Sequence, residues 1–204
     1  MTALVAVWVG ILAALVVLFV AVARRVSQLV AGTRELERFQ RAIAEIDAAT
    51  ASVVDPLLGS LDGFVRHHAG DPAQLAGDLP HAAASLRDTQ ARAKQIDVPV
   101  GLAAEAQHII GELDRAARSA DLAAAGLVTQ LEGHRDRQGE SSVDVKRGAL
   151  NLRHARDIVR TEASRIAAMT ANELRTRRDS PWARKGDGPS LYVADGTTDD
   201  DLDG

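Results

Sequence analysis

The chain of 204 residues contains no cysteine. Disulfides, thiolate metal sites and lipid attachment through cysteine are therefore excluded, although this absence does not identify a cellular compartment. Aromatic residues make up only 3% of the chain, and residues 26–175 hold just Phe39 and Phe64. A core in that region must be built from small and aliphatic side chains. This composition favours closely packed helices over a wide globule.

The sequence patterns of common catalytic sites are also missing. We find no glycine-rich phosphate loop, no G-x-S-x-G motif and no H-E-x-x-H motif. The net charge of -4 is too small to indicate a partner by itself. We therefore predict a protein that is not an enzyme and needs no cofactor.

The beginning of the chain lacks charge altogether. From Ala3 to Ala23, 21 residues carry no charged or strongly polar group. A helix of that length rises far enough to cross a hydrocarbon core of roughly 30 Å. We predict a transmembrane anchor over residues 1–25, held by membrane lipids.

The charges that follow this stretch predict its orientation. Basic residues lie only on its C-terminal side, which places that side in the cytoplasm and the N-terminus outside. Ala21-Val22-Ala23 has the form of a signal-peptidase site, so a cleaved and secreted chain is the alternative. A signal peptide usually has a basic start and a shorter apolar run, and this chain has neither. The basic residues are Arg24, Arg25, Arg34, Arg38 and Arg41, of which Arg24 and Arg25 would contact lipid head groups.

After this region, apolar residues recur every three or four positions, as in helices that pack side by side. Gly32 predicts a juxtamembrane hinge over residues 26–33. The first helix then runs to about residue 68, with Thr50 interrupting its apolar seam and Pro56 bending it. Its seam residues are Leu36, Phe39, Ile43, Ile46, Val53 and Leu57.

Three further helices are predicted, over residues 78–96, 102–133 and 141–178. Asp78 would cap the first of them, and Ser141 with Asp144 would form a capping box at the start of the last. Short connections make neighbouring helices antiparallel. We predict an all-α fold: a transmembrane helix, an antiparallel bundle of three to four helices over residues 34–178, and a tail. The helix at residues 78–96 is the shortest, so one end of the bundle would either thin to three helices or offer its apolar face to a partner.

Residues 179–204 form the predicted tail, which is rich in glycine, proline and charge. Such a composition cannot bury enough apolar surface to fold, so we predict disorder. The tail begins basic and ends acidic. Trp182, Arg184 and Lys185 would contact a protein partner or an anionic surface.

The helix predicted at residues 141–178 carries a basic stripe. Lys146, Arg153 and Arg160 recur at intervals of seven residues and therefore lie on one face. Such a stripe can contact lipid head groups, nucleic acid or a protein. We expect intramolecular ion pairs instead, with the acidic helix at residues 102–133. No aromatic residue interleaves the stripe, so nucleic acid is not an expected partner.

Two pairs of residues have the spacing of metal ligands in helical bundles. Glu105 with His108 forms a Glu-x-x-His pair, and Asp78 with His81 is a weaker copy. Both pairs begin their helices, and antiparallel neighbours would place those starts at opposite ends of the bundle. We therefore predict surface polar pairs and no metal site.

Together these features predict a single-pass scaffold or accessory subunit that binds other proteins at the cytoplasmic membrane surface. A sensory or signalling module is the alternative, in which a shift of packed helices moves the anchor. Incomplete seams also leave a second copy of the chain as a partner. Cleavage after Ala23 would instead give a secreted helical bundle.

Overall fold

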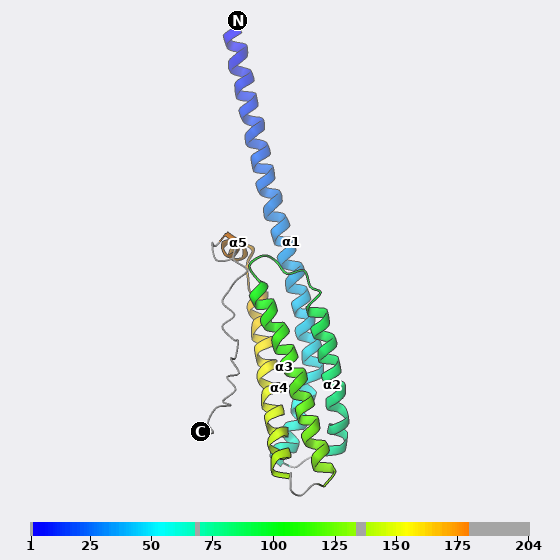
Figure 1. Cartoon of the computed structure of the whole chain (residues 1–204). Coiled ribbons are helices and arrows are strands. Elements are labelled where there is room, and N and C mark those ends of the chain that lie inside the picture. The colour runs from blue at the N-terminus through cyan, green and yellow to red at the C-terminus, as the bar shows by residue number, and fades with distance from the viewer. Residues whose placement is uncertain (1, 68–69, 134–137, 180–204) are drawn as a thin grey trace, which may run out of the picture.

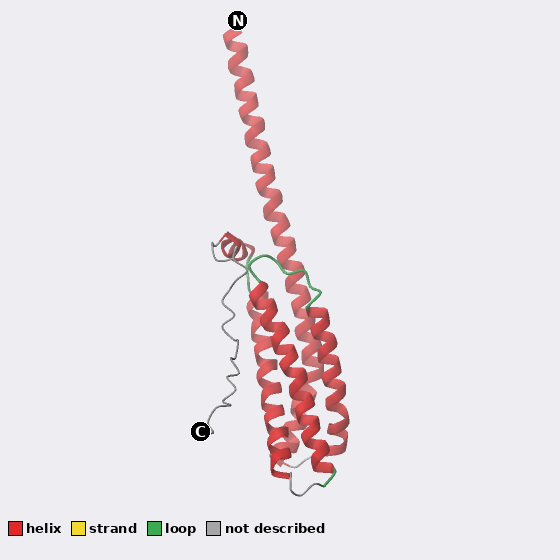
Figure 2. Cartoon of the chain, viewed as in Figure 1, coloured by secondary structure: helices red, strands yellow, loops and turns green. Residues whose placement is uncertain are grey.

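A computed structural model describes the backbone of residues 2–67, 70–133 and 138–179. Within these ranges it describes every side chain except those of residues 2–14, 25–31, 138 and 179. The described residues form α-helices and no strand (Figure 2), which confirms the predicted all-α class. The helices are α1 (Thr2–His67), α2 (Pro72–Ala93), α3 (Ala103–Leu131), α4 (Gln138–Ala167) and α5 (Ala171–Asp179).

The second half of α1 forms a bundle with α2, α3 and α4, in which successive helices run in opposite directions (Figure 1). Each of these helices packs against two neighbours, so the order around the bundle is α1, α2, α3, α4. The first half of α1 projects beyond the bundle without a companion, and α5 lies at the end from which it projects. The predicted antiparallel helical bundle is therefore confirmed, with four helices.

Most residues of the predicted seam of α1 are buried, but Val54 is the core residue where Val53 was predicted, and Val53 is only partly buried. Leu36, Phe39, Ile43 and Ile46 of α1 are all buried. Thr50, which interrupts the seam in sequence, is buried as well, because its hydroxyl donates a 2.7 Å hydrogen bond to the carbonyl oxygen of Ile46. The helix thus satisfies the polar atom of Thr50 locally, and the seam continues without a gap.

Helices α3 and α4 pack most extensively, and two glycines allow their close approach. A Cβ atom at Gly148 would lie 2.7 Å from the carbonyl oxygen of Ser119 and 2.8 Å from the Cβ atom of Ala123. A Cβ atom at Gly126 would lie 2.8 Å from the carbonyl oxygen of Ser141. Small residues at this contact therefore allow the backbones of α3 and α4 to approach each other closely.

The start of α2 differs from the prediction. We placed the N-cap at Asp78, but α2 begins at Pro72, and Asp71 is its N-cap. The Asp71 side chain accepts a 2.8 Å hydrogen bond from the backbone amide of Ala73. Proline in the first helical turn is favourable because its missing N–H would have no partner there. With 22 residues α2 is longer than predicted, although it remains shorter than α3 with 29 and α4 with 30.

The last predicted helix is also divided differently. Ser141 does not cap it, since α4 already includes Gln138 and Ser141 is buried within the helix. At the other end α4 stops at Ala167, and α5 follows as a separate helix. The amide of Gln40 from α1 donates hydrogen bonds of 2.9 Å to the carbonyl oxygens of Ile166 and Met169. These bonds add a partner to carbonyl groups at the end of the helix, although the carbonyl of Ile166 also accepts a 3.1 Å hydrogen bond from the amide of Met169.

The region predicted as a hinge is helical. α1 runs without interruption through residues 26–33 and also through Pro56. One glycine in a helix costs only about 1 kcal/mol, which neighbouring helical residues offset. The first half of α1 is therefore continuous with the bundle.

Across the residues that the structure describes, no helix has a stretch both long and apolar enough to cross a membrane. This finding does not support the transmembrane helix predicted at residues 1–25.

Candidate functional site

The polar residues of interest lie on the seams between helices, because a four-helix bundle leaves its charged side chains at the edges of the buried faces. Three groups of them stand out. The first joins α4 to α1, the second joins α3, α4 and α5, and the third borders a hollow between α1 and α2.

The first group contains the predicted basic stripe. Arg153 donates a hydrogen bond to Asp62 of α1, whereas Lys146 and Arg160 are exposed and have no ion-pair partner among the described side chains. Only part of the stripe is paired, and its partner is α1, although we expected the acidic α3. The reason is the rotation of α4 about its own axis, which turns the edge that carries Arg153 toward α1.

Arg156 is the most buried cation of this group. Its Nη1 lies 2.6 Å from Asp47 Oδ1, and its Nε lies 3.0 Å from Asp55 Oδ1. Burial alone would lower the pKa of Arg156, but the hydrogen bonds to Asp55 and Asp47 outweigh it, and the pKa is raised. The guanidinium therefore stays charged and links one turn of α4 to two turns of α1.

The acids of α3 are occupied elsewhere, which explains why they do not meet the stripe. Glu105 pairs with Arg177 of α5 and lies 3.3 Å from Nη2 of Arg165 in α4. Asp121 pairs with Arg87 of α2. Each acid thus finds a cation on whichever helix faces it, and α5 is held to the bundle by one of these pairs.

Two glutamates flank His108 within the second group. Nδ1 of His108 lies 3.6 Å from Glu162 Oε1, and Nε2 lies 3.8 Å from Glu112 Oε1. These distances permit electrostatic attraction when the imidazole is protonated but are too long for hydrogen bonds. Arg115 approaches Glu112 Oε1 to 3.1 Å, and Arg165 approaches Glu162 Oε2 to 2.7 Å.

The buried oxygens of this group are incompletely satisfied. Glu112 Oε2 has no hydrogen bond, and Glu162 Oε2 has none either, since its contact with Arg165 is an ion pair without hydrogen-bond geometry. Buried polar atoms without partners are costly and often mark the place of an additional ligand or water. No group of three histidine or acidic side chains within the described ranges could hold a metal ion, however.

The two pairs with metal-ligand spacing lie on different helices. Asp78 and His81 are both exposed on α2, so they are surface polar residues as expected. Glu105 and His108 lie on α3, and Glu105 is buried against arginines of α4 and α5.

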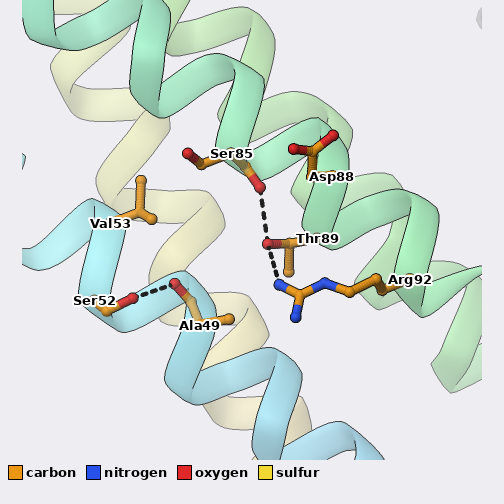
Figure 3. Close-up of a pocket in the computed structure, with 7 residues that line it drawn as sticks. All are labelled: Ala49, Ser52, Val53, Ser85, Asp88, Thr89 and Arg92. Atoms are coloured by element: carbon orange, nitrogen blue, oxygen red, sulfur yellow. Dashed lines mark hydrogen bonds between the residues drawn. The ribbon is translucent and has the colours of Figure 1, made fainter.

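A hollow of about 440 Å³ lies between α1 and α2 (Figure 3). Asp88 lines this hollow, and most of the other polar side chains there are engaged: Thr89 donates to the carbonyl oxygen of Ser85 at 2.8 Å, and Arg92 donates to the Thr89 hydroxyl at 3.2 Å. Ser52 likewise donates to the carbonyl oxygen of Ala49. With its donors turned back onto their own helices, the hollow offers little specific chemistry to a ligand.

The remaining predicted contact residues are only partly visible. Arg24 is exposed, whereas the side chain of Arg25 lies outside the described residues. Trp182, Arg184 and Lys185 also lie outside them, as does the rest of residues 180–204.

Sequence reasoning missed the contacts that hold α5. Thr170 and Glu173 form a capping box: the Glu173 carboxylate accepts a 2.7 Å hydrogen bond from the backbone amide of Thr170, and the Thr170 hydroxyl accepts one from that of Glu173. The T-x-x-E pattern was a sequence signal for this start. The hydrogen bonds from the amide and hydroxyl of Thr170 lower the pKa of Glu173. By contrast, nothing in the sequence indicates that Gln40 caps α4.

Comparisons with protein-family models, with curated proteins and with solved structures give no match.

Proposed function

We propose that this protein is a membrane-anchored helical scaffold that binds other proteins and does not catalyse a reaction. The observation that carries the proposal is the projecting half of α1. Its described apolar side chains are exposed, with Leu15 at 59% and Phe19 at 74%, and no other helix accompanies them. An apolar helix surface of this kind favours a lipid or protein environment over water.

The sequence around this segment supports a lipid environment. The uncharged run from Ala3 to Ala23 ends at Arg24, which is exposed, and further arginines follow only on that side. The asymmetry favours a bundle in the cytoplasm with the N-terminus outside. Arg24 and Arg25 would then lie at the level of the lipid head groups.

Partner binding is supported by two exposed cations of α4 and by the sequence that follows α5. Lys146 and Arg160 are exposed on α4, and Trp182, Arg184 and Lys185 follow α5 in the sequence. An anchor confines these groups to a thin layer beside the membrane and so raises their effective concentration for partners in the same layer. A homo-oligomer would use the same surfaces.

A signalling module is the second candidate, and one observation favours it. Because α1 is continuous from the projecting half into the core, a rotation or shift of that half would be transmitted to the residues that pack on α2 and α4. A hinge at residues 26–33 would have decoupled the two parts.

Membrane extraction tests the anchor. We expect the full chain to remain with membranes after washing at alkaline pH, and Val17→Arg with Leu18→Arg to release it, since charges in the apolar run oppose insertion. The control, Ser52→Arg with Ser60→Arg, adds the same charge on exposed positions of the bundle and should stay membrane-bound. Release of the unmodified chain would overturn the proposed anchor.

A reporter fused after residue 204 tests the orientation. We expect activity of a cytoplasmic reporter and none of a reporter that works only outside the cytoplasm. The opposite result would favour the secreted bundle. Crosslinking in membranes then identifies the neighbours of the bundle, and absence of any specific neighbour would contradict the scaffold.

A further inference from the structure

One face of α4 is left open by the fold. Val143, Lys146, Arg147, Leu150 and His154 follow one another at helical spacing, so they share one side of the helix, here called the outer face of α4. All five are exposed, Val143 at 51% and Leu150 at 64%. The face therefore combines two uncovered apolar side chains with basic ones.

The cations of this face differ from several others on the bundle. Arg87, Arg118 and Arg153 each have an acidic partner. Lys146 and Arg147 have none among the described side chains. Since unpaired charge beside uncovered apolar surface is typical of a binding site, the outer face of α4 is suited to an acidic segment that also carries apolar residues.

The nearby acids delimit this face. Asp157, one turn beyond His154, ends the positive surface toward the α5 end. Asp144 precedes Arg147 by three residues and Glu140 precedes Val143 by three, so both acids border this face near the start of α4. Neither acid forms an ion pair with Lys146 or Arg147 among the described side chains.

The chain itself contains a segment of the matching chemistry. Residues 186–204 include no lysine or arginine, and they combine the apolar run Leu191-Tyr192-Val193 with acidic residues on both sides. Their structure is outside the described part of the chain. The acidic residues are Asp187, Asp195, Asp199, Asp200, Asp201 and Asp203.

The length of chain allows this segment to reach the face. Leu150 lies 17 residues before the end of α4 at Ala167, which corresponds to about 26 Å along the helix. The 12 residues from Asp179 to Leu191 can span up to about 40 Å when extended. The segment can therefore reach Leu150 while α5 stays in place. Tethering also gives it a local concentration of about millimolar.

We propose that residues 187–203 of this chain dock on the outer face of α4. Leu191, Tyr192 and Val193 cover Val143 and Leu150, while the aspartates lie near Lys146 and Arg147. The docked segment occupies the surface that an acidic partner would use, so it competes with such a partner. This contact goes beyond the proposed scaffold function and does not depend on the anchor.

Distances between two spin labels test the contact in the full chain. The absence of cysteine allows labels at Thr161→Cys, on the exposed side of α4, and at Ala194→Cys. We expect a narrow distribution of short distances at low salt. Lys146→Glu with Arg147→Glu should lengthen the main distance by about 10 Å or more, because the freed segment can extend away from the bundle.

A matched charge reversal controls for net charge. Arg34→Glu with Arg38→Glu makes the same change on exposed positions of α1, near the other end of the bundle, and should leave the distances unchanged. Replacing Asp199, Asp200 and Asp201 by lysine in the Lys146→Glu, Arg147→Glu chain should restore the short distance. Circular dichroism verifies that every variant stays helical.

Three results would overturn the proposal. The first is a broad distribution in the otherwise unmodified labelled chain, and the second is an equal response to both charge reversals. The third is loss of the short distance on mixing with excess unlabelled chain, since that would place the contact between two copies.

Discussion

At the scale of single residues, Arg156 shows how this bundle uses a charge in its interior. It is exposed by only 9%, yet it contacts Asp47 and Asp55, which are themselves partly open to water at 29% and 57%. A buried cation is tolerated because two carboxylates compensate for its lost hydration. The pair of contacts also fixes the rotation of α4 relative to α1.

Replacing Arg156 by methionine keeps most of the side-chain volume but removes both ion pairs. We expect the free energy of unfolding to fall by about 1–2 kcal/mol, a modest loss because the aspartates regain water. Arg160→Met, one turn further along α4 at an exposed position without a described ion pair, should change it by less than about 0.5 kcal/mol. Urea unfolding measures the free energy of unfolding of both variants. Equal losses of stability in the two variants would contradict a specific role for Arg156.

At the scale of elements, the contact between α3 and α4 depends on two glycines rather than on large side chains. Gly148 faces the backbone of α3 so closely that even one methyl group has no room. Gly111 of α3 is different, because a Cβ atom there would meet nothing within 4 Å. A glycine within a helix can therefore be required by close packing, as at Gly148, or lie where a larger residue would fit, as at Gly111.

This contrast predicts opposite effects of the same substitution. Gly148→Ala should lower the free energy of unfolding by about 1–3 kcal/mol, because the obstructing atoms are backbone atoms and the Cβ atom of Ala123, none of which can rotate away. Gly111→Ala should raise it by about 0.5–1 kcal/mol, because alanine loses less entropy in a helix. Denaturant unfolding of the two variants measures these changes. If Gly148→Ala stabilised the protein, α3 and α4 would have to lie further apart than the structure shows.

The helix α5 depends on its capping box, which makes its start sensitive to acid. Because the pKa of Glu173 is lowered in the folded chain, the ionised carboxylate stabilises α5 at neutral pH. That contribution is present above the ordinary glutamate pKa of about 4.3 and is lost as the pH falls through the lower folded value.

The amide resonance of Thr170 should report this titration directly in nuclear magnetic resonance spectra. We expect its midpoint to lie below the ordinary glutamate value. In Glu173→Gln the same resonance should not titrate, although α5 still forms, because glutamine can also close a capping box. A midpoint at or above the ordinary value would contradict the hydrogen bonds at the start of α5.

At the scale of the whole molecule, the chain consists of a compact bundle and a helical projection that is continuous with it. Among the described residues, the buried core begins at Leu36, after the projecting half of α1. The two parts therefore share a helix but not a core. We therefore expect the stability of the folded chain to come from the bundle.

Removing residues 1–31 tests this division. We expect the shortened chain to unfold cooperatively with a free energy within about 0.5 kcal/mol of the full chain, because no described core contact is lost. Calorimetry of both chains in the same detergent provides the measurement. A large loss of stability would show that the projection packs against the bundle or against a second copy.

Much of the fold could be predicted from local sequence features. The seam Leu36, Phe39, Ile43 and Ile46 is buried as predicted, since hydrophobic periodicity depends only on which residues face the same side of a helix. The predictions failed where two local signals competed. In α2, Gly77 and Pro80 argue against a helix before Asp78, whereas Asp71 and Pro72 indicate an earlier helix start. The prediction follows the first pair, and the structure shows that the second pair marks the start.

The helical class, the buried faces and the reliance on small side chains are predictable from the amino-acid sequence, because they follow from composition and from spacing along one helix. Which charged side chains meet is visible only in the folded bundle. Arg153 and Arg156 pair with α1 and not with α3, Gln40 caps a helix more than 120 residues away, and Gly32 does not interrupt α1. Ion pairs and caps between helices depend on the rotation and axial position of each helix against its neighbours, and these are set by the packing of the whole bundle.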